Sequence, residues 1–154
     1  LAQWARQRPD LDGSPMAVIG RLSRATRLID AELRRTFAAH GLDAASFDVL
    51  ATLRRSDPPH RLTPAALMQS AMVTSGAISQ RLDRLEERGL VTRTRSAADA
   101  RSVEVALTAD GRELIDRALP DHVATEERLL AGLDAQERTD LAAGLRRLLE
   151  SLDG

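Results

Sequence analysis

The chain has 154 residues, of which 43% are hydrophobic, so it can bury one sizeable core, with or without extended helical arms. The lack of cysteine excludes disulfides, thiolate metal sites and thiol redox sensing, and the sequence shows neither a secretory leader nor an apolar run of membrane-spanning length, so we expect a cytoplasmic protein with no membrane partner. The formal net charge of −1 does not by itself indicate a nucleic-acid partner, although nine arginines outnumber five acidic residues between Arg54 and Arg101.

The first 41 residues are expected to form two helices. A short helix over residues 1–9 carries Trp4, the only tryptophan, and residues 9–13 break it. A longer helix spans residues 15–40 and ends at Gly41. Its apolar side chains recur at steps of three and four residues: Val18, Leu22, Ala25, Ile29, Leu33 and Phe37. Such a long stripe favours packing against a second copy of the chain.

One helix followed by a helix-turn-helix is predicted between residues 42 and 89. A helix over residues 42–55, capped by Asp43, is followed by a turn at residues 57–60. Thr63 and Pro64 then open a short helix over residues 64–70, and residues 71–73 link it to a second helix that starts at Thr74 and ends at Gly89. Two short helices joined by so tight a link are typical of this motif. The apolar stripe of the second helix consists of Ile78, Leu82 and Leu85.

A β-hairpin is predicted after the second helix, with strands over residues 91–95 and 103–107. In the first strand, valine and arginine alternate with threonine, and in the second strand apolar positions alternate with Glu104 and Ala106. Residues 96–102 form the turn. A polar-faced helix followed by a hairpin with arginine at its tip predicts a winged helix-turn-helix, in which the helix enters the major groove and the tip reaches the minor groove.

Two long helices are expected at the C-terminal end. Thr108 caps the first, which extends to Leu130, and Asp134 and Glu137 form a capping box for the second. The second helix carries an apolar stripe of Leu141, Leu145, Leu148 and Leu152. The predicted fold is therefore mainly α with a small β-hairpin wing. Its expected parts are an N-terminal helix or lid (1–13), a helical dimerisation region (14–41 and 109–154) and a winged helix-turn-helix domain (42–108).

Short sequence patterns around the predicted wing resemble one family of bacterial transcriptional regulators. They are Arg84-Leu85-Glu86 with Gly89-Leu90-Val91 at the end of the second helix, Asp99 with Arg101 and Ser102 at the wing, and Leu107-Thr108 with Gly111 at the start of the next helix. Together with the order of the elements, they resemble the MarR family of dimeric regulators over nearly the whole chain. The resemblance implies a homodimer that binds double-stranded operator DNA.

The DNA contacts expected from this arrangement lie on the second helix and the wing. On the helix, the candidates are Thr74, Ser75, Gly76, Ser79, Gln80 and Arg84, which would face the major groove. Arg95 and Arg101 would lie on the wing side. The resemblance implies that Arg101 enters the minor groove and that Asp99 orients the wing by pairing with a nearby arginine such as Arg95.

Four further residues match a pattern found within that family. They are Trp4 in the N-terminal helix, Asp48 in the helix before the helix-turn-helix, Arg81 in the second helix and Arg93 in the first wing strand. Apart from Phe47 before the aspartate, the set resembles the urate-responsive group of PecS- and HucR-type repressors. It implies urate or a similar small aromatic anion as effector, stacked on Trp4, with Arg93 binding its charge and Asp48 accepting its N–H groups. An Asp48–Arg81 pair would tie the second helix to the scaffold, and a competing ligand would shift that helix.

Each of these residues also has a plain structural interpretation. Asp48 fits a helix cap or a core salt bridge, Arg93 fits a phosphate contact, and Trp4 fits a residue that closes the dimer surface. The three histidines show no metal-ligand spacing and are interpreted as ordinary surface residues: His40, His60 and His122. No metal or cofactor site is expected.

The leading hypothesis is a homodimeric repressor that leaves a pseudo-palindromic operator when a small aromatic anion, such as urate, binds. One alternative is a winged-helix module that binds protein instead of DNA, and another is a regulator of the same family that responds to a different phenolic ligand. An enzyme is not expected, because the sequence contains no nucleophile elbow, phosphate loop, metal cluster or paired-carboxylate motif.

Overall fold

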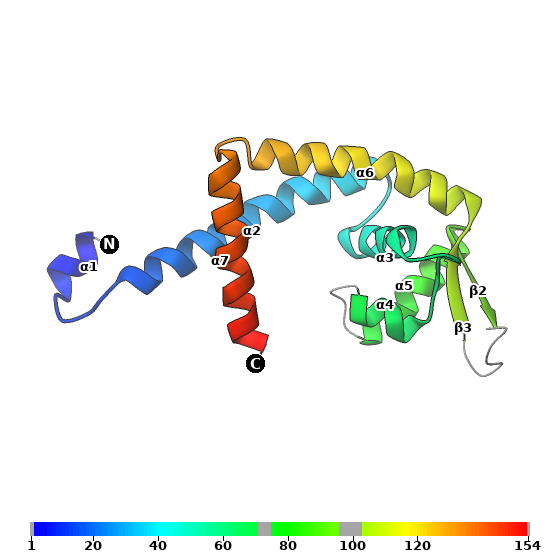
Figure 1. Cartoon of the computed structure of the whole chain (residues 1–154), viewed down its shortest axis with the longest axis horizontal. Coiled ribbons are helices and arrows are strands. Elements are labelled where there is room, and N and C mark those ends of the chain that lie inside the picture. Colours follow the sequence, from blue (N-terminus) through cyan, green and yellow to red (C-terminus); the bar gives the residue numbers. More distant parts are fainter. Residues whose placement is uncertain (1, 71–74, 96–102, 154) are drawn as a thin grey trace.

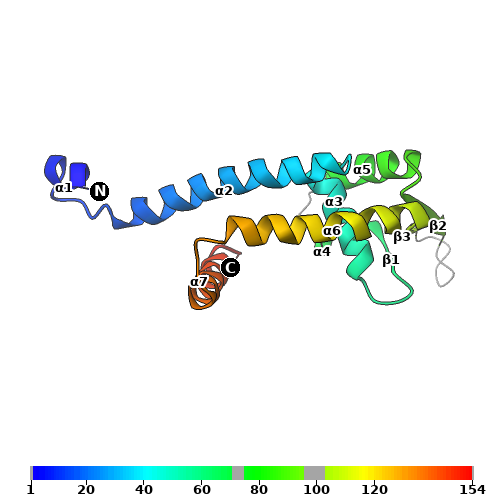
Figure 2. The ribbon, with the colours of Figure 1, turned by 90° about the horizontal axis from the view of Figure 1, so that it is seen from above.

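Two long helices, α2 (Ser14–Ala39) and α6 (Ala109–Leu129), run side by side and hold a smaller α/β unit at one end (Figures 1 and 2). The computed structural model describes residues 2–70, 75–95 and 103–153. The unit at the end consists of α3 (Ala44–Arg55), β1 (Arg61–Leu62), α4 (Pro64–Ser70), α5 (Ser75–Glu87), β2 (Val91–Arg95) and β3 (Val103–Leu107). The outer helices are α1 (Ala2–Gln7) and α7 (Ala135–Asp153). The predicted class, mainly helical with a small antiparallel wing, is confirmed.

The helices α3, α4, α6 and α7 begin directly after the capping residues that the sequence indicated. Asp43, Thr63 and Thr108 each accept a hydrogen bond through a side-chain oxygen from the backbone N–H three residues later, at 2.7, 3.1 and 3.0 Å. Asp134 and Glu137 exchange two hydrogen bonds of 2.9 Å at the start of α7. These side chains satisfy N–H groups that have no partner within the helix, which sets the first residue of each helix.

Glycines in the left-handed conformation end α2 and α5. Gly41 has φ 65° and Gly89 has φ 67°, a region in which other residues are strained. After each glycine, the next backbone N–H donates to a carbonyl five residues earlier, at 2.9 Å in both cases. Both predicted helix ends are therefore confirmed.

The sheet has three strands rather than the predicted two. Its order is β1-β3-β2, with both neighbours of β3 antiparallel to it. Leu62 of β1 and Arg93 of β2 lie on either side of Val105. The sequence prediction missed β1 because a strand of two residues is too short to show an alternating pattern.

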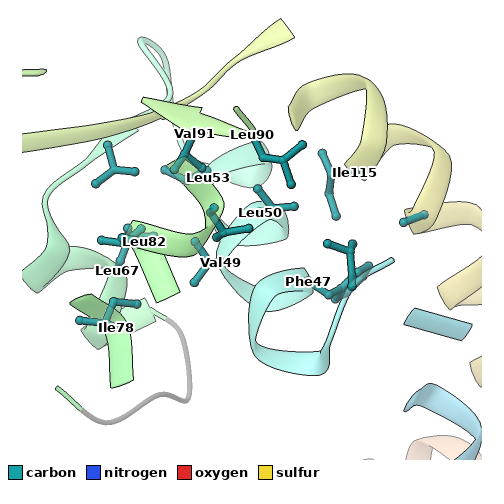
Figure 3. Packing of buried hydrophobic residues seen from close by; sticks show 14 of the residues in the cluster. Phe47, Val49, Leu50, Leu53, Leu67, Ile78, Leu82, Leu90, Val91 and Ile115 are labelled. Atoms are coloured by element: carbon teal, nitrogen blue, oxygen red, sulfur yellow. The ribbon is translucent and has the colours of Figure 1, made fainter. Parts of the chain in front are cut away.

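The core lies between α3, α5, α6 and the sheet (Figure 3). All three residues of the predicted α5 stripe are buried, as are Phe47, Leu50 and Leu53 on α3. β2, β3 and α6 close the core with Val91, Val105 and Ile115. Because the apolar side of α5 is committed to this core, its polar side faces outward.

Gly111, in the first turn of α6, packs closely against the backbone of Leu90, which follows α5, and this contact leaves no room for a side chain at position 111. A Cβ added to Gly111 would lie 1.9 Å from the carbonyl oxygen of Leu90, and backbone on both sides prevents relief. We expect Gly111→Ala to lower the free energy of unfolding by at least about 2 kcal/mol, measured by urea denaturation. Gly20→Ala is the matched control, because a Cβ at Gly20 meets nothing within 4 Å. Equal denaturation midpoints for the two variants would contradict this packing.

Apolar side chains on the outer helices remain exposed in the single chain. No residue of α7 is buried, and Leu149 and Leu152 are 54% and 71% exposed. On α2, Val18 and Ile19 are both 57% exposed. In the two views, α7 and α1 stand away from the α/β unit (Figures 1 and 2). In the described part of the chain, α2 and α7 therefore expose apolar side chains on their surfaces.

Candidate nucleic-acid interface and effector cavity

α5 presents a polar face opposite its buried stripe. Ser79, Gln80 and Arg84 are exposed, whereas Ile78 and Leu82 on the other side are buried. Hydroxyl, amide and guanidinium groups on one exposed helical face are the groups that bind base edges and phosphates in a major groove. This arrangement agrees with the predicted recognition helix.

The remaining predicted DNA contacts are placed only in part. Ser75 and Gly76 lie in the first turn of α5, and Arg95 is exposed at the end of β2. Thr74, Asp99 and Arg101 lie outside the described residues, so the predicted wing-tip contact and its orientation by Asp99 stay predictions.

Arg93 of β2 faces α5, on the same side of the strand as the buried Val91. Its Nη2 lies 2.6 Å from Glu86 Oε2 and 2.7 Å from Asp83 Oδ1. Its Nε donates to Glu86 Oε2 at 2.8 Å, and its backbone N–H donates to Glu86 Oε1 at 3.0 Å. The hydrogen bonds from Arg93 lower the pKa of Glu86 below its ordinary value, and those to Glu86 and Asp83 raise the pKa of Arg93. Arg93 therefore binds carboxylates of α5 rather than approaching Asp48 or Trp4.

The predicted Asp48–Arg81 pair is wrong, because Arg81 binds Asp43 instead. Arg81 Nη1 lies 2.6 Å from Asp43 Oδ1 and 3.4 Å from Ser46 Oγ. Asp48 comes five residues after Asp43, which places it about 140° further around α3 and away from Arg81. Burial alone would raise the pKa of Asp43, but hydrogen bonds from Ser46 and Arg81 lower it below its ordinary value. The predicted tie between α5 and α3 thus exists with a different carboxylate.

A cavity of about 420 Å³ lies between α2, α3 and α5, beside this pair. Half of its lining residues are apolar, and the other half are two arginines and two aspartates. The Nε of Arg81 is buried and has no hydrogen-bond partner among the described residues. An unsatisfied buried donor is costly, so the cavity is suited to an acceptor group from a bound molecule. The lining residues are Asp30, Leu33, Arg34, Phe37, Asp43, Ala44, Ala45 and Arg81.

Asp48 lines a separate cavity of about 470 Å³ between α3 and α6. Across it, Arg54 Nε donates to Asp116 Oδ1 at 2.7 Å. His122, predicted to be an ordinary surface residue, packs there instead, with its ring centre 4.6 Å from that of Phe47 and 5.5 Å from that of Phe37. Residues 115, 118, 122 and 125 follow one another at helical steps of three and four, so they share one face of α6. Because residues 115, 118 and 125 of that face are buried, the same spacing could have indicated that His122 packs inward.

The helix α1, which carries Trp4, lies at the far end of α2 from α3 and α5 (Figures 1 and 2). Trp4 lines a hollow there together with Met16, Ala17, Gly20 and Arg21. Within one chain, the structure therefore does not bring together the four predicted effector residues. Trp4, Asp48 and Arg81 line three different hollows, and Arg93 belongs to the α5–β2 network.

Two further features bear on the class of protein. No helix in the described part of the chain has the length and apolar character needed to cross a membrane. Across residues 2–70, 75–95 and 103–153, no three acidic or histidine side chains gather in a group that could hold a metal ion.

Comparison with known proteins gives consistent matches along the chain. The sequence profile of the MarR family matches residues 40–102, which include the whole helix-turn-helix and β2. The HTH-type transcriptional regulator PecS of Dickeya dadantii is 41% identical over 152 residues, covering 99% of this chain and 92% of that protein.

Solved structures are similar in both fold and sequence. Sco3205 of Streptomyces coelicolor, a MarR family transcriptional regulator solved in complex with DNA, superposes with a TM-score of 0.85 and 26% identity, covering 92% of this chain and 93% of that one. BpsR of Bordetella bronchiseptica, whose DNA binding is regulated by 6-hydroxynicotinic acid, gives a TM-score of 0.77 and 27% identity, covering 85% and 91%.

Proposed function

The chain belongs to the MarR family of DNA-binding transcriptional regulators, and we propose that it is a homodimeric repressor released from a pseudo-palindromic operator by a small aromatic anion. It is a regulator rather than an enzyme. The observation that carries the proposal is the exposed polar face of α5, held outward by a stripe buried in the core. A protein-interaction module would not need this face, and the relatives are transcriptional regulators. The proposed mechanism requires no metal or cofactor, and it places the protein with the chromosome in the cytoplasm.

The proposed DNA interface consists of α5 and the wing. Ser79, Gln80 and Arg84 would contact the major groove, together with residues 74–76 at the start of the helix. Arg95 and Arg101 would contact the backbone and the minor groove, with Asp99 orienting the wing. The DNA complex of Sco3205 supports this role for the shared fold.

A gel-shift titration with the DNA upstream of the protein's own coding region tests the function. We expect a discrete complex with this DNA in the presence of excess unrelated competitor, and weaker binding as salt rises, because phosphate contacts release counterions. Equal binding to the upstream DNA and to the competitor would contradict a specific regulator.

The exposed apolar side chains on α2 and α7 support the proposed homodimer. A stable monomer rarely leaves so many leucines and valines in water, and two-fold pairing of these helices would bury them. Residues 14–41 and 109–154 would thus form the dimerisation region. Their pairing would set the spacing of two α5 helices to about one turn of DNA.

We place the effector in the cavity between α2, α3 and α5. The unsatisfied Nε of Arg81 would donate to the anion, and the apolar wall with Phe37 would hold a flat ring. An anion that draws Arg81 away from Asp43 loosens the tie between α5 and α3, so it favours an arrangement with lower DNA affinity. Trp4, Asp48 and Arg93 lie outside this cavity, so Arg81 is the proposed direct contact. BpsR, which responds to an aromatic carboxylic acid, supports this class of effector.

Titration calorimetry with urate and with salicylate tests the effector site. We expect one of the two anions to bind the wild type, and Arg81→Ala to weaken that binding by about tenfold or more, because a charged hydrogen bond is lost. Arg54→Ala, in the separate α3–α6 cavity, is the matched control and should keep the affinity. Trp4→Ala distinguishes two roles of Trp4. If Trp4 stacks on the anion, the substitution lowers the affinity for the anion, and if Trp4 only closes the dimer surface, that affinity is unchanged. Binding that survives Arg81→Ala, or no binding of either anion, would exclude the site as proposed.

A further inference from the structure

Polar contacts between β2 and α5 join one arginine to two carboxylates, beside the buried side chains of Val91 and Leu82. Glu86 accepts both the backbone N–H and the side-chain Nε of Arg93, at 3.0 and 2.8 Å. The same guanidinium reaches Asp83 through Nη2 at 2.7 Å. Main chain and side chain of one strand residue are thus held by one turn of the helix, which fixes both the position and the direction of β2 relative to α5.

This network lies at a point that controls the wing. Arg93 pairs with Val105 in the middle of the sheet, two residues before β2 ends at Arg95 and the chain enters the predicted wing tip. A small rotation of β2 about this point would move Arg95, at the end of the strand, relative to α5. The contacts of Arg93 with Asp83 and Glu86 therefore restrain the angle between β2 and α5, the two parts of the proposed DNA interface.

The contacts of Arg93 also neutralise negative charge on α5. Asp83 and Glu86 are carboxylates on the helix that carries Ser79, Gln80 and Arg84, and unpaired they would repel the phosphates of bound DNA. The guanidinium of Arg93 lies against both of them. Its Nε, its Nη2 and its backbone N–H are engaged by the two carboxylates, so an anion that binds these three groups would have to displace a carboxylate.

We propose that Arg93 is a positioning residue for operator binding, which clamps the wing to α5 and neutralises Asp83 and Glu86 without contacting DNA or effector. This inference rests on the proposed role of α5 as the recognition helix. It assigns to Arg93 a function different from the effector contact and the phosphate contact that the sequence suggested. An effector contact and a phosphate contact would each give a result that differs from the one expected of a positioning residue.

A double-mutant cycle measured by fluorescence anisotropy with labelled operator tests the inference. Arg93→Ala should weaken binding by about tenfold in the wild type, and much less when Asp83→Asn and Glu86→Gln are already present, because the partners are then gone. The dependence of affinity on salt concentration should keep its slope, since no phosphate contact is lost. An equal cost in both backgrounds, together with a slope reduced by about one, would show a phosphate contact and overturn the inference.

Three controls separate the other outcomes. Calorimetry with urate and with salicylate should give the same affinities for Arg93→Ala as for the wild type, and a lost affinity for either anion would instead make Arg93 an effector contact. Arg84→Ala tests the recognition role of α5 separately, because unchanged operator binding in that variant would fail the proposed function whatever the cycle shows. Thermal unfolding checks the fold of every variant. If Arg93→Ala does not fold, Arg93→Gln replaces it in the same cycle, with the same two contradicting results.

Discussion

Leu149→Asp is expected to convert the protein to monomers and to weaken operator binding by at least about a hundredfold. Leu149 is 54% exposed on α7, a helix with no buried residue, and in the proposed dimer it would lie in an apolar interface. A carboxylate there would lose its water without gaining a partner. Each monomer would then bind one half-site without the gain that comes from linking two sites. Light scattering gives the mass, and anisotropy gives the affinity.

The matched control for this variant is Ser151→Asp. It adds the same charge to the same helix, about 200° around the axis from Leu149, on an exposed position. It should leave both the dimer and the affinity nearly unchanged. A Leu149→Asp protein that remains dimeric would show that the partner surface is not on this face of α7.

Arg84→Glu is expected to reduce operator affinity by about a hundredfold or more while leaving the unfolding temperature unchanged. Arg84 is exposed on α5, so no packing is lost, but a carboxylate in the groove would face phosphates and base acceptors. Anisotropy at several salt concentrations measures the effect. Arg117→Glu makes the same charge change on the exposed side of α6 and should cost far less. Similar losses in the two variants would mean that total charge, and not the α5 face, controls binding.

The main features of the fold follow from local signals in the sequence. Capping side chains such as Asp43 and Thr108 set where helices begin, and Gly41 and Gly89 set where they end, because each acts within one turn of the chain. The buried stripe of α5 and the alternation of β2 and β3 also reflect periodicities that can be counted directly. These signals are enough to predict a winged helix-turn-helix between long helices.

The site depended on contacts between elements, which periodicity does not determine. Arg81 binds Asp43 rather than Asp48 because the two aspartates point to different sides of α3. Trp4 matches a family pattern, but it packs beside the first turns of α2, a helix of 26 residues whose other end meets α3. For Arg93, the strand alternation allows it to face the helices, but the alternation does not identify its partners Asp83 and Glu86.

α5 therefore carries connections to two neighbouring parts of the protein. Near its middle, Arg81 ties it to the start of α3 beside the proposed effector cavity. One turn later, Asp83 and Glu86 tie it to the wing through Arg93. In the proposed mechanism, a change at the first connection would reach the wing through α5, a helix of thirteen residues.

Hydroxyl-radical footprinting on the upstream DNA, with and without the effector, tests the central claim most directly. A homodimer that binds through α5 and the wing predicts two protected regions related by two-fold symmetry, with centres about one helical turn apart, and the loss of both when the anion is added. A single asymmetric region, or protection that the anion does not change, would contradict the account.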